Sequence, residues 1–227
     1  MENKTRTIIL IVIALLFIGV VIFGMTKKDS PQGEVIAWND NMTMGSRDAA
    51  HHFIVYTDVF CPYCDNFSRV LEENTEALQE EYLDTGDVFL EYRMTDMISD
   101  HSENSTRGGE AAYCAAEQGK FWEFYEAILA KLWDDYHSKG IGTSKTSPEI
   151  PKLDDEYYIS ASDEVDKDAL KTCLDEHQTL ETLKSNTRKA SRLVNGGVPY
   201  FAFDGWTGSG FEGNWSTVKA MFAAGMK

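Results

Sequence analysis

Residues 52–71 read HFIVYTDVFCPYCDNFSRVL, and this stretch decides the fold. Its first part, over about 52–59, is rich in β-branched and aromatic residues, which predicts a buried strand. After Cys64, apolar residues recur at helical spacing, which predicts a helix over about 61–83. The motif Cys61-Pro62-Tyr63-Cys64 therefore lies at the junction of a strand and a helix.

A cysteine in the first turn of a helix is placed for reaction. The unpaired backbone N–H groups and the helix dipole favour the thiolate over the thiol at that position. The thiolate is the nucleophile, and motifs of this kind can lower the pKa of the first thiol to between about 3.5 and 7. The position of Cys61 therefore predicts an exchange of disulfides.

Zinc binding is the main alternative for a Cys-x-x-Cys motif. A structural zinc site needs four ligands and usually a second close pair of cysteines. The other two cysteines, Cys114 and Cys173, stand alone, and His51 and His52 are typical of the exposed start of a strand. We therefore expect no metal and no cofactor beyond the redox-active cysteine pair.

The N-terminal segment is a separate unit. Residues 7–26 carry no charge and are almost wholly apolar, and about 20 such residues span a bilayer core of roughly 30 Å. A cleaved signal peptide is the alternative, but its apolar region is shorter, about 7–15 residues, and ends in a small-residue cleavage site that is absent here. We expect residues 1–28 to be an uncleaved transmembrane helix, a signal-anchor, followed by a polar connector over 29–48 with a short edge strand at 35–38.

The charge of the chain limits its possible binding partners but does not fix the orientation of the predicted transmembrane helix. The net charge of −16 over 227 residues argues against nucleic acid, because phosphate binding needs a basic surface. Lys4 and Arg6 before the apolar segment oppose Lys27 and Lys28 after it, so charge leaves the orientation open. We assign the C-terminal side to the outside of the cell membrane, because disulfide chemistry belongs to oxidising compartments.

The rest of the chain alternates between strand and helix patterns. A second strand, a helical block, a third strand, a glycine-rich hairpin and a closing helix are expected at about 88–93, 107–193, 198–203, 204–211 and 214–225. The helical block holds two runs of apolar residues at helical spacing, from Phe121 to Leu132 and from Leu170 to Leu180. A polar loop over 138–157 separates them.

This order of elements predicts the fold. A β-α-β unit, a helical block and a β-β-α unit make an α/β thioredoxin fold with a helical insertion domain. The two parts of the thioredoxin fold would be residues 49–106 and 194–227, and the insertion would be residues 107–193.

A proline opens the third predicted strand, in the sequence Gly197-Val198-Pro199. A strand proline has no N–H for the ladder, so its position needs a reason. One interpretation is an ordinary trans turn. In the thioredoxin superfamily this position instead carries a cis-proline packed against the cysteine pair, and the residue before it offers its backbone to an incoming substrate strand. By that resemblance Val198 and Pro199 shape the substrate groove.

Three segments together resemble the DsbA-like thiol:disulfide oxidoreductases: TDVFCPYC at 57–64, AAYCAAEQGKFW at 111–122 and the Gly-Val-Pro sequence at 197–199. The resemblance covers about residues 35–227. It implies that Cys61 is the exposed sulfur that clients attack and that Cys64 is its buried resolving partner.

The same resemblance assigns further roles around the motif. Pro62 and Tyr63 would tune the reduction potential. Many thioredoxin relatives carry a buried acid six residues before the first cysteine, where this chain has Val55. Proton transfer at Cys64 would then run through water or a neighbouring carboxylate.

The remaining cysteines, Cys114 and Cys173, each lie on an apolar helical face of the insertion. Two buried free thiols are one interpretation. An even count of four cysteines in an oxidising compartment favours a second, structural disulfide, and some DsbA-like relatives carry such a bond in the insertion.

The resemblance implies an extracytoplasmic enzyme that donates the Cys61–Cys64 disulfide to reduced or unfolded client proteins. A membrane partner of the DsbB or VKOR type would reoxidise it by passing electrons to quinone. Two alternatives remain open: a reductase or isomerase that uses the same cysteines, and a thioredoxin-fold binding module without redox activity.

Overall fold

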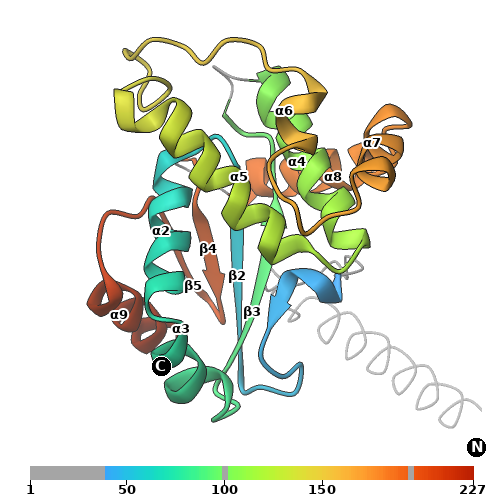
Figure 1. Ribbon diagram of the computed structural model, residues 1–227. Coiled ribbons are helices and arrows are strands. Elements are labelled where there is room, and N and C mark those ends of the chain that lie inside the picture. The colour runs from blue at the N-terminus through green and yellow to red at the C-terminus, as the bar shows by residue number, and fades with distance from the viewer. Residues whose placement is uncertain (1–38, 99–101, 194–196) are drawn as a thin grey trace, which may run out of the picture. The chain divides into compact units, whose positions relative to one another are not determined.

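The computed structural model of the chain describes residues 39–98, 102–193 and 197–227 (Figure 1). All described residues belong to one compact unit. The transmembrane helix expected at 1–28 and the edge strand expected at 35–38 lie outside the described residues. Within the described ranges, no helix combines the length and the apolar character needed to cross a bilayer.

The described residues form a five-stranded sheet with the order β1-β3-β2-β4-β5. Its strands are Thr43–Met44, His51–Thr57, Val88–Met94, Tyr200–Phe203 and Trp206–Ser209, numbered β1 to β5 along the chain. β2 and β3 are parallel, and the other neighbouring strands are antiparallel. This arrangement confirms the thioredoxin fold, with β2 in the middle of the sheet and the cysteine motif directly after it (Figure 1).

The hairpin between β4 and β5 turns at Asp204 and Gly205. Both residues have positive φ angles, 40° and 98°, as a two-residue turn between twisted strands requires. Residues 206–209, within the glycine-rich hairpin predicted at 204–211, form β5 and pair with all of β4.

The helix that follows the motif is shorter than expected. The sequence predicted one helix over about 61–83, whereas the structure has α2 (Pro62–Glu73), α3 (Thr75–Leu78) and a π-helical turn, η2 (Gln79–Leu83). Asn74 leaves the helical conformation, with φ −122° and ψ 27°. Its side-chain amide donates a hydrogen bond to the carbonyl of Val70, and side chains that bond nearby backbone groups compete with the helix in this way.

The two faces of the sheet are covered differently. On one face Phe53 and Val55 of β2 pack in a large cluster with residues of α2 and of α9 (Trp215–Gly225). The backbone of α9 approaches closely, because a Cβ at Gly225 would overlap the ring of Phe203. On the other face Ile54 packs in a smaller cluster with both motif cysteines and with residues of α8.

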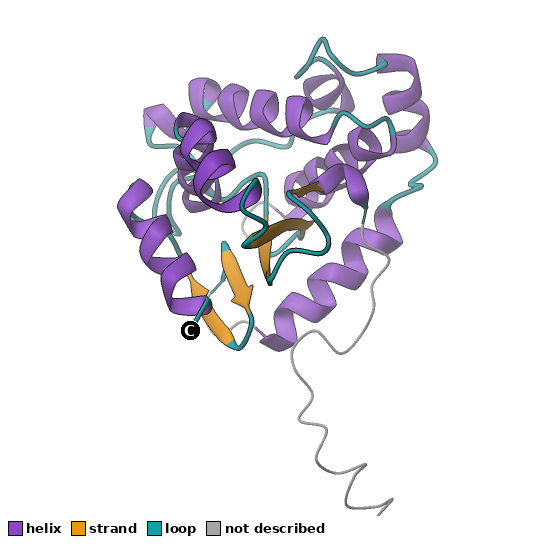
Figure 2. Cartoon of the chain, turned by 90° about the horizontal axis from the view of Figure 1, so that it is seen from below, coloured by secondary structure: helices purple, strands orange, loops and turns teal. Residues whose placement is uncertain are grey.

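The insertion consists of helices that gather toward the top and right of Figure 1. They are α4 (Ser102–Glu117), α5 (Phe121–Asp135), η4 (His137–Lys139), α6 (Asp155–Ile159), α7 (Lys167–Asp175) and α8 (Leu180–Leu193). Figure 2 shows the same helices around the sheet in a view turned by 90°. Residues of α4 and α5 belong to the same hydrophobic cluster as Phe53 of β2, so the insertion and the sheet share one core.

The start of the insertion and one helix within it differ from the expected ones. α4 begins at Ser102 rather than at Arg107. The apolar run from Leu170 to Leu180 is divided between α7 and α8, because His177 takes a positive φ of 50° between them. That conformation ends a right-handed helix.

Candidate active site

Cys61 and Cys64 lie together at the start of α2. Cys61 is the N-cap residue with an extended backbone, and Pro62 occupies the first turn, where its missing N–H costs nothing. The backbone N–H of Cys64 donates to the Sγ of Cys61 over 3.4 Å. Both cysteines are free thiols, so the described state is the reduced dithiol.

The loop before β4 closes the site from the opposite side. The Val198–Pro199 peptide bond is cis, and the thiol of Cys61 donates a hydrogen bond to the carbonyl of Val198 over 3.2 Å. Residues 137 positions apart are thereby brought into contact. Of the groove residues expected from the sequence, Val198 lies directly against the reactive sulfur, and Pro199 follows it across the cis peptide bond.

The exposure of Cys61 differs from the expectation. The resemblance implied an exposed first cysteine, but the Cys61 residue is 1% exposed, as is Cys64. Cys61 packs in one cluster with Val198, and Met97 and Leu193 lie against that cluster. A client sulfur can reach Cys61 only after part of this cover moves aside.

Tyr63 is the most accessible part of the motif. Its side chain is 42% exposed, which is unusual for a large aromatic residue. Tyr63 and Pro62 stand between the two cysteines on the first turn of α2, so Tyr63 is the motif residue that an approaching protein meets first.

Cys64 is buried beneath the first turn of α2. Burial is the largest influence on its pKa and raises it well above the ordinary value of a thiol, and the adjacent Cys61 raises it further. Hydrogen bonds from the Thr57 hydroxyl and from the backbone N–H of Asp58 act in the opposite direction. Val55, at the position where relatives carry an acid, lies in the large apolar cluster of the sheet.

Asp58 supports the turn between β2 and α2. Its carboxylate accepts hydrogen bonds from the backbone N–H groups of Phe60 and Ile98, at a distance of 3.0 Å in each case. It also accepts one from the hydroxyl of Ser105. Burial raises the pKa of Asp58 to about 6, and these hydrogen bonds limit the rise. One carboxylate thus connects the active-site turn, the segment after β3 and helix α4.

A disulfide joins Cys114 on α4 to Cys173 on α7. Their Cα atoms are 5.9 Å apart, and both residues are buried. This bond holds two helices of the insertion together, which leaves Cys61 and Cys64 as the free cysteines of the chain.

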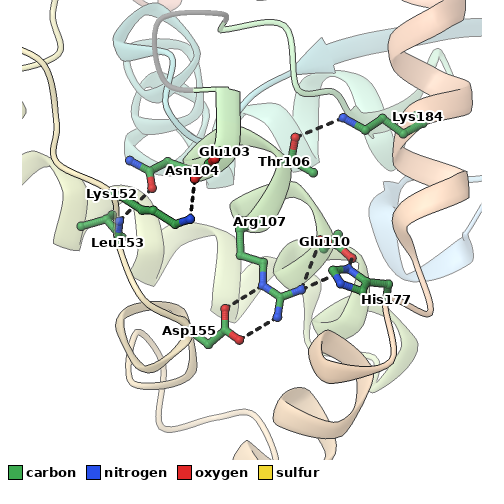
Figure 3. Close-up of a pocket in the computed structure, with 10 residues that line it drawn as sticks. All are labelled: Glu103, Asn104, Thr106, Arg107, Glu110, Lys152, Leu153, Asp155, His177 and Lys184. Carbon is green, nitrogen blue, oxygen red and sulfur yellow. Dashed lines mark hydrogen bonds and ion pairs between the residues drawn. The ribbon is translucent and has the colours of Figure 1, made fainter.

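A hollow of about 520 Å³ lies beside α4 and is lined by no residue of the cysteine motif (Figure 3). Arg107 makes two parallel hydrogen bonds of 2.6 Å to Asp155 at the start of α6. Glu110 pairs with both Arg107 and His177, and Lys152 pairs with Glu103 (Figure 3). Because the charged groups here neutralise one another, we interpret the hollow as a set of ion pairs that fixes α4 to its neighbours.

Metal coordination has no visible basis in the part of the chain that the structure describes. No group of three or more histidine, cysteine, aspartate or glutamate side chains there is arranged to hold an ion.

Sequence reasoning missed three polar residues around Cys64: Thr57, Asp58 and Tyr125. Asp58 could have been found, because an aspartate two residues before a backbone N–H at a strand end is typical of an Asx turn. No local pattern indicates that Tyr125 of α5 hydrogen-bonds Thr57 of β2 over 2.6 Å.

Comparison with known proteins identifies the family of the chain. The family model described as Thioredoxin matches residues 38–209. The probable disulfide bond formation protein D of Bacillus anthracis is 24% identical over 196 residues, which is 85% of this chain and 83% of that protein. The protein of the same name from Bacillus cereus is 25% identical over 155 residues, which is 66% of this chain and 70% of that protein.

Solved structures share the fold. Chlamydia trachomatis DsbA superposes with a TM-score of 0.59 at 16% identity, over 87% of this chain and 95% of that one. Oxidised BdbD from Bacillus subtilis superposes with a TM-score of 0.57 at 17% identity, over 82% of this chain and 92% of that one. Both likenesses include an α/β fold with a helical insertion, as found here.

Proposed function

The chain belongs to the thioredoxin family as a DsbA-like thiol:disulfide oxidoreductase, and on that premise we propose that it donates the Cys61–Cys64 disulfide to folding client proteins. The observation that carries the proposal is the position of the Cys61 sulfur. It lies at the N-terminus of α2, next to Cys64, and in hydrogen-bond contact with the Val198 carbonyl before a cis-proline. A thiolate at a helix N-terminus is stabilised, which makes the corresponding disulfide a strong oxidant.

The reaction proceeds in two exchanges. A client thiolate attacks the Sγ of Cys61, the bond to Cys64 breaks, and Cys64 leaves with the electron pair and takes up a proton. A second client thiolate then attacks the client sulfur of the mixed disulfide, so the client leaves oxidised and Cys61 leaves as a thiolate. The client loses two electrons and the cysteine pair gains them.

The loop before β4 would position the client. In the dithiol, the Val198 carbonyl accepts the hydrogen bond of the Cys61 thiol. An extended client segment could add its backbone beside this loop in the manner of an extra β-strand. Tyr63, exposed on the first turn of α2, would contact the same segment.

Trapping of mixed disulfides tests the proposal. In the C64S variant Cys61 can still attack or be attacked, but the resolving sulfur is absent. Client proteins should therefore remain bound to Cys61 as species that disappear on reduction. The matched C61S variant should trap none. Failure of C64S to retain any client, with the protein folded and expressed, would contradict the redox function.

We further propose that the catalytic domain lies outside the cytoplasmic membrane and is held there by residues 1–28. The buried Cys114–Cys173 disulfide supports an oxidising compartment, and the uncharged segment 7–26 supports an anchor. The full chain should fractionate with membranes, and external protease should digest it in cells whose wall has been removed. A chain protected from protease until lysis would contradict this location.

A membrane reoxidant would complete the cycle. We propose a quinone-linked partner of the DsbB or VKOR type, because each client oxidation leaves two electrons on the cysteine pair. Thiol trapping in growing cells should find Cys61 and Cys64 mostly oxidised, and mostly reduced once the quinone pool is kept reduced. An unchanged redox state would argue against such a partner.

A further inference from the structure

The reaction requires a proton to reach and to leave a fully buried sulfur. When the Cys61–Cys64 bond breaks, Cys64 departs with the electron pair, and when the bond re-forms the Cys64 thiol gives up a proton. Cys64 is 1% exposed. Burial raises its pKa well above the ordinary thiol value, so the free thiol stays protonated at neutral pH. Bulk water cannot exchange this proton directly.

Three polar groups act on the pKa of Cys64 through hydrogen bonds: Cys61, the backbone N–H of Asp58 and the hydroxyl of Thr57. Outside the cysteine pair, Thr57 supplies the side chain among them. A backbone amide holds its proton, and the Asp58 carboxylate is occupied by Phe60, Ile98 and Ser105. The Thr57 hydroxyl can accept one proton and release another.

Thr57 continues the path into the core. Its Oγ1 lies 2.6 Å from the hydroxyl of Tyr125 on α5, and both residues are 1% exposed. Two hydroxyl groups in a direct hydrogen bond can pass a proton by exchanging donor and acceptor roles. Burial keeps the Tyr125 hydroxyl protonated by raising its pKa, so it transfers protons without becoming a phenolate.

The hydroxyl of Ser68 on α2 is the next group along this path. Its hydroxyl is close enough to the hydroxyls of Tyr92 and Tyr125 to lower the pKa of both. The Ser68 Oγ is buried, yet it makes no hydrogen bond of standard geometry to a described residue. It lines a cavity of about 50 Å³ together with Tyr92 and Tyr125, which is room for about one or two water molecules.

Ser68 also lines a larger cavity, of about 150 Å³, which Asp65 lines as well. The Asp65 side chain is 1% exposed, and neither of its oxygens has a hydrogen bond of standard geometry. Its described partner is Arg69, at 3.3 Å. A buried carboxylate and a buried hydroxyl, three residues apart on one helix and facing one cavity, form a site for bridging water.

We propose that Asp65 is the proton reservoir of the resolving Cys64, reached through the hydroxyls of Thr57, Tyr125 and Ser68 and the water that these two cavities hold. During disulfide formation the proton passes from the Cys64 thiol to the Asp65 carboxylate, and during client oxidation it returns. Thr57 touches the reacting sulfur and is a catalytic residue. Tyr125, Ser68 and Asp65 act through it and are positioning residues. The inference rests on the redox reaction proposed above.

The charge state of Asp65 suits this role. Burial raises the pKa of Asp65 to about 6, against the opposing effect of Arg69, and the negative charge of Glu72 adds to the rise. Glu126 and Asp134 of α5 line the same cavity. A carboxyl group that titrates near neutral pH can both take and give the proton.

The reaction of the reduced full chain with the chromogenic disulfide dithiobis(nitrobenzoate) separates the two cysteines. In the first phase Cys61 attacks the reagent, one thionitrobenzoate leaves and a mixed disulfide forms. In the second phase Cys64 loses its proton, attacks Cys61 and releases the second thionitrobenzoate. The second phase does not depend on reagent concentration, and it reports the proton transfer from Cys64.

Variants that remove one hydroxyl or charge should slow the second phase alone. Y125F, T57V and D65N should each lower its rate about 100-fold or more, since general acid–base catalysis contributes about 10²- to 10⁴-fold, and should leave the first phase unchanged. T57S keeps the hydroxyl and should restore the rate. In the unaltered chain the second phase should accelerate as the pH rises through about 6, and this inflection should be absent in D65N.

A matched control separates this role from a loss of packing. Tyr158 is a fully buried tyrosine whose hydroxyl donates to the carbonyl of Asn104 and makes no described contact with Cys64. Y158F should leave both phases unchanged. If Y125F and T57V match Y158F, the relay is wrong, and if D65N alone matches Y158F, Asp65 is not the reservoir. Client trapping and the reduction potential test the proposed function separately, since this reaction needs no client.

Discussion

Removal of the Cys114–Cys173 disulfide should destabilise the chain by a calculable amount. The bond joins α4 to α7 across 59 residues of sequence. Without it, the unfolded chain regains the conformational freedom that the closed loop removes. The C114A/C173A double variant, made with Cys61 and Cys64 both replaced by alanine, changes this bond and leaves no thiol to exchange with it.

The loop length sets the magnitude. The chain-entropy relation gives a loss of about 14 cal/mol/K for a loop of this length, which is about 4 kcal/mol at 25 °C. For a chain of this size, 1 kcal/mol shifts the midpoint of thermal unfolding by about 2–4 °C. The double variant should therefore unfold about 8–16 °C lower.

Urea unfolding followed by tryptophan fluorescence and by far-UV circular dichroism measures the effect. The parent with the disulfide intact should exceed the double variant by about 4 kcal/mol, and unfolding of the parent in excess reductant should remove that difference. A difference below about 1 kcal/mol, or a parent whose stability is unaffected by reductant, would refute the reasoning that this bond restricts the unfolded chain.

Three further substitutions, at Asp58, Arg107 and Gly108, test how the residues around the site contribute to stability. Burial raises the pKa of Asp58 from 3.8 to about 6, so its contribution to stability is complete below about pH 4 and is lost as the pH rises through about 6. Between about pH 4 and pH 7, urea unfolding should show D58N gaining about 3 kcal/mol relative to the unaltered chain, and parallel pH curves would contradict this. R107M removes the guanidinium that pairs with the buried Glu110, leaves His177 as its partner, and should cost about 3–5 kcal/mol in urea unfolding. K152M removes an exposed pair with Glu103 and should cost less than about 1 kcal/mol, so equal losses would refute the distinction. G108A places a Cβ against Val59 and Phe60, just before the motif. It should lower the thermal midpoint through about 1–3 kcal/mol of overpacking, and an unchanged midpoint would show that α4 can shift.

The sequence carried enough information for the elements next to the motif. The β-branched run before Cys61 predicted β2, because a strand buried on both faces is a continuous apolar run, and the helical spacing after Cys64 predicted α2, because that helix buries one face. Breaks inside apolar runs were not predictable in this way. Asn74 and His177 interrupt two of them, and each break depends on the backbone conformation of a single residue.

The functional site was also predictable only in part. The residue types and their order identified Cys61, Cys64 and the proline loop. Met97 and Leu193 pack against the cluster that contains Cys61, and no local pattern connects them to the motif. Likewise, Thr57 and Tyr125 lie 68 residues apart and meet because α5 packs against the sheet. Contacts of this kind follow from the fold as a whole.

The reduction potential of the Cys61–Cys64 pair tests the central claim most directly. We would equilibrate the full chain in glutathione buffers and quantify the oxidised fraction of the pair by thiol trapping. A disulfide donor should show a potential near about −120 mV, whereas a reductant of the thioredoxin type would show about −270 mV. The two values differ by about 7 kcal/mol. A potential near the upper value supports donation of the disulfide to clients, and one near the lower value would contradict it.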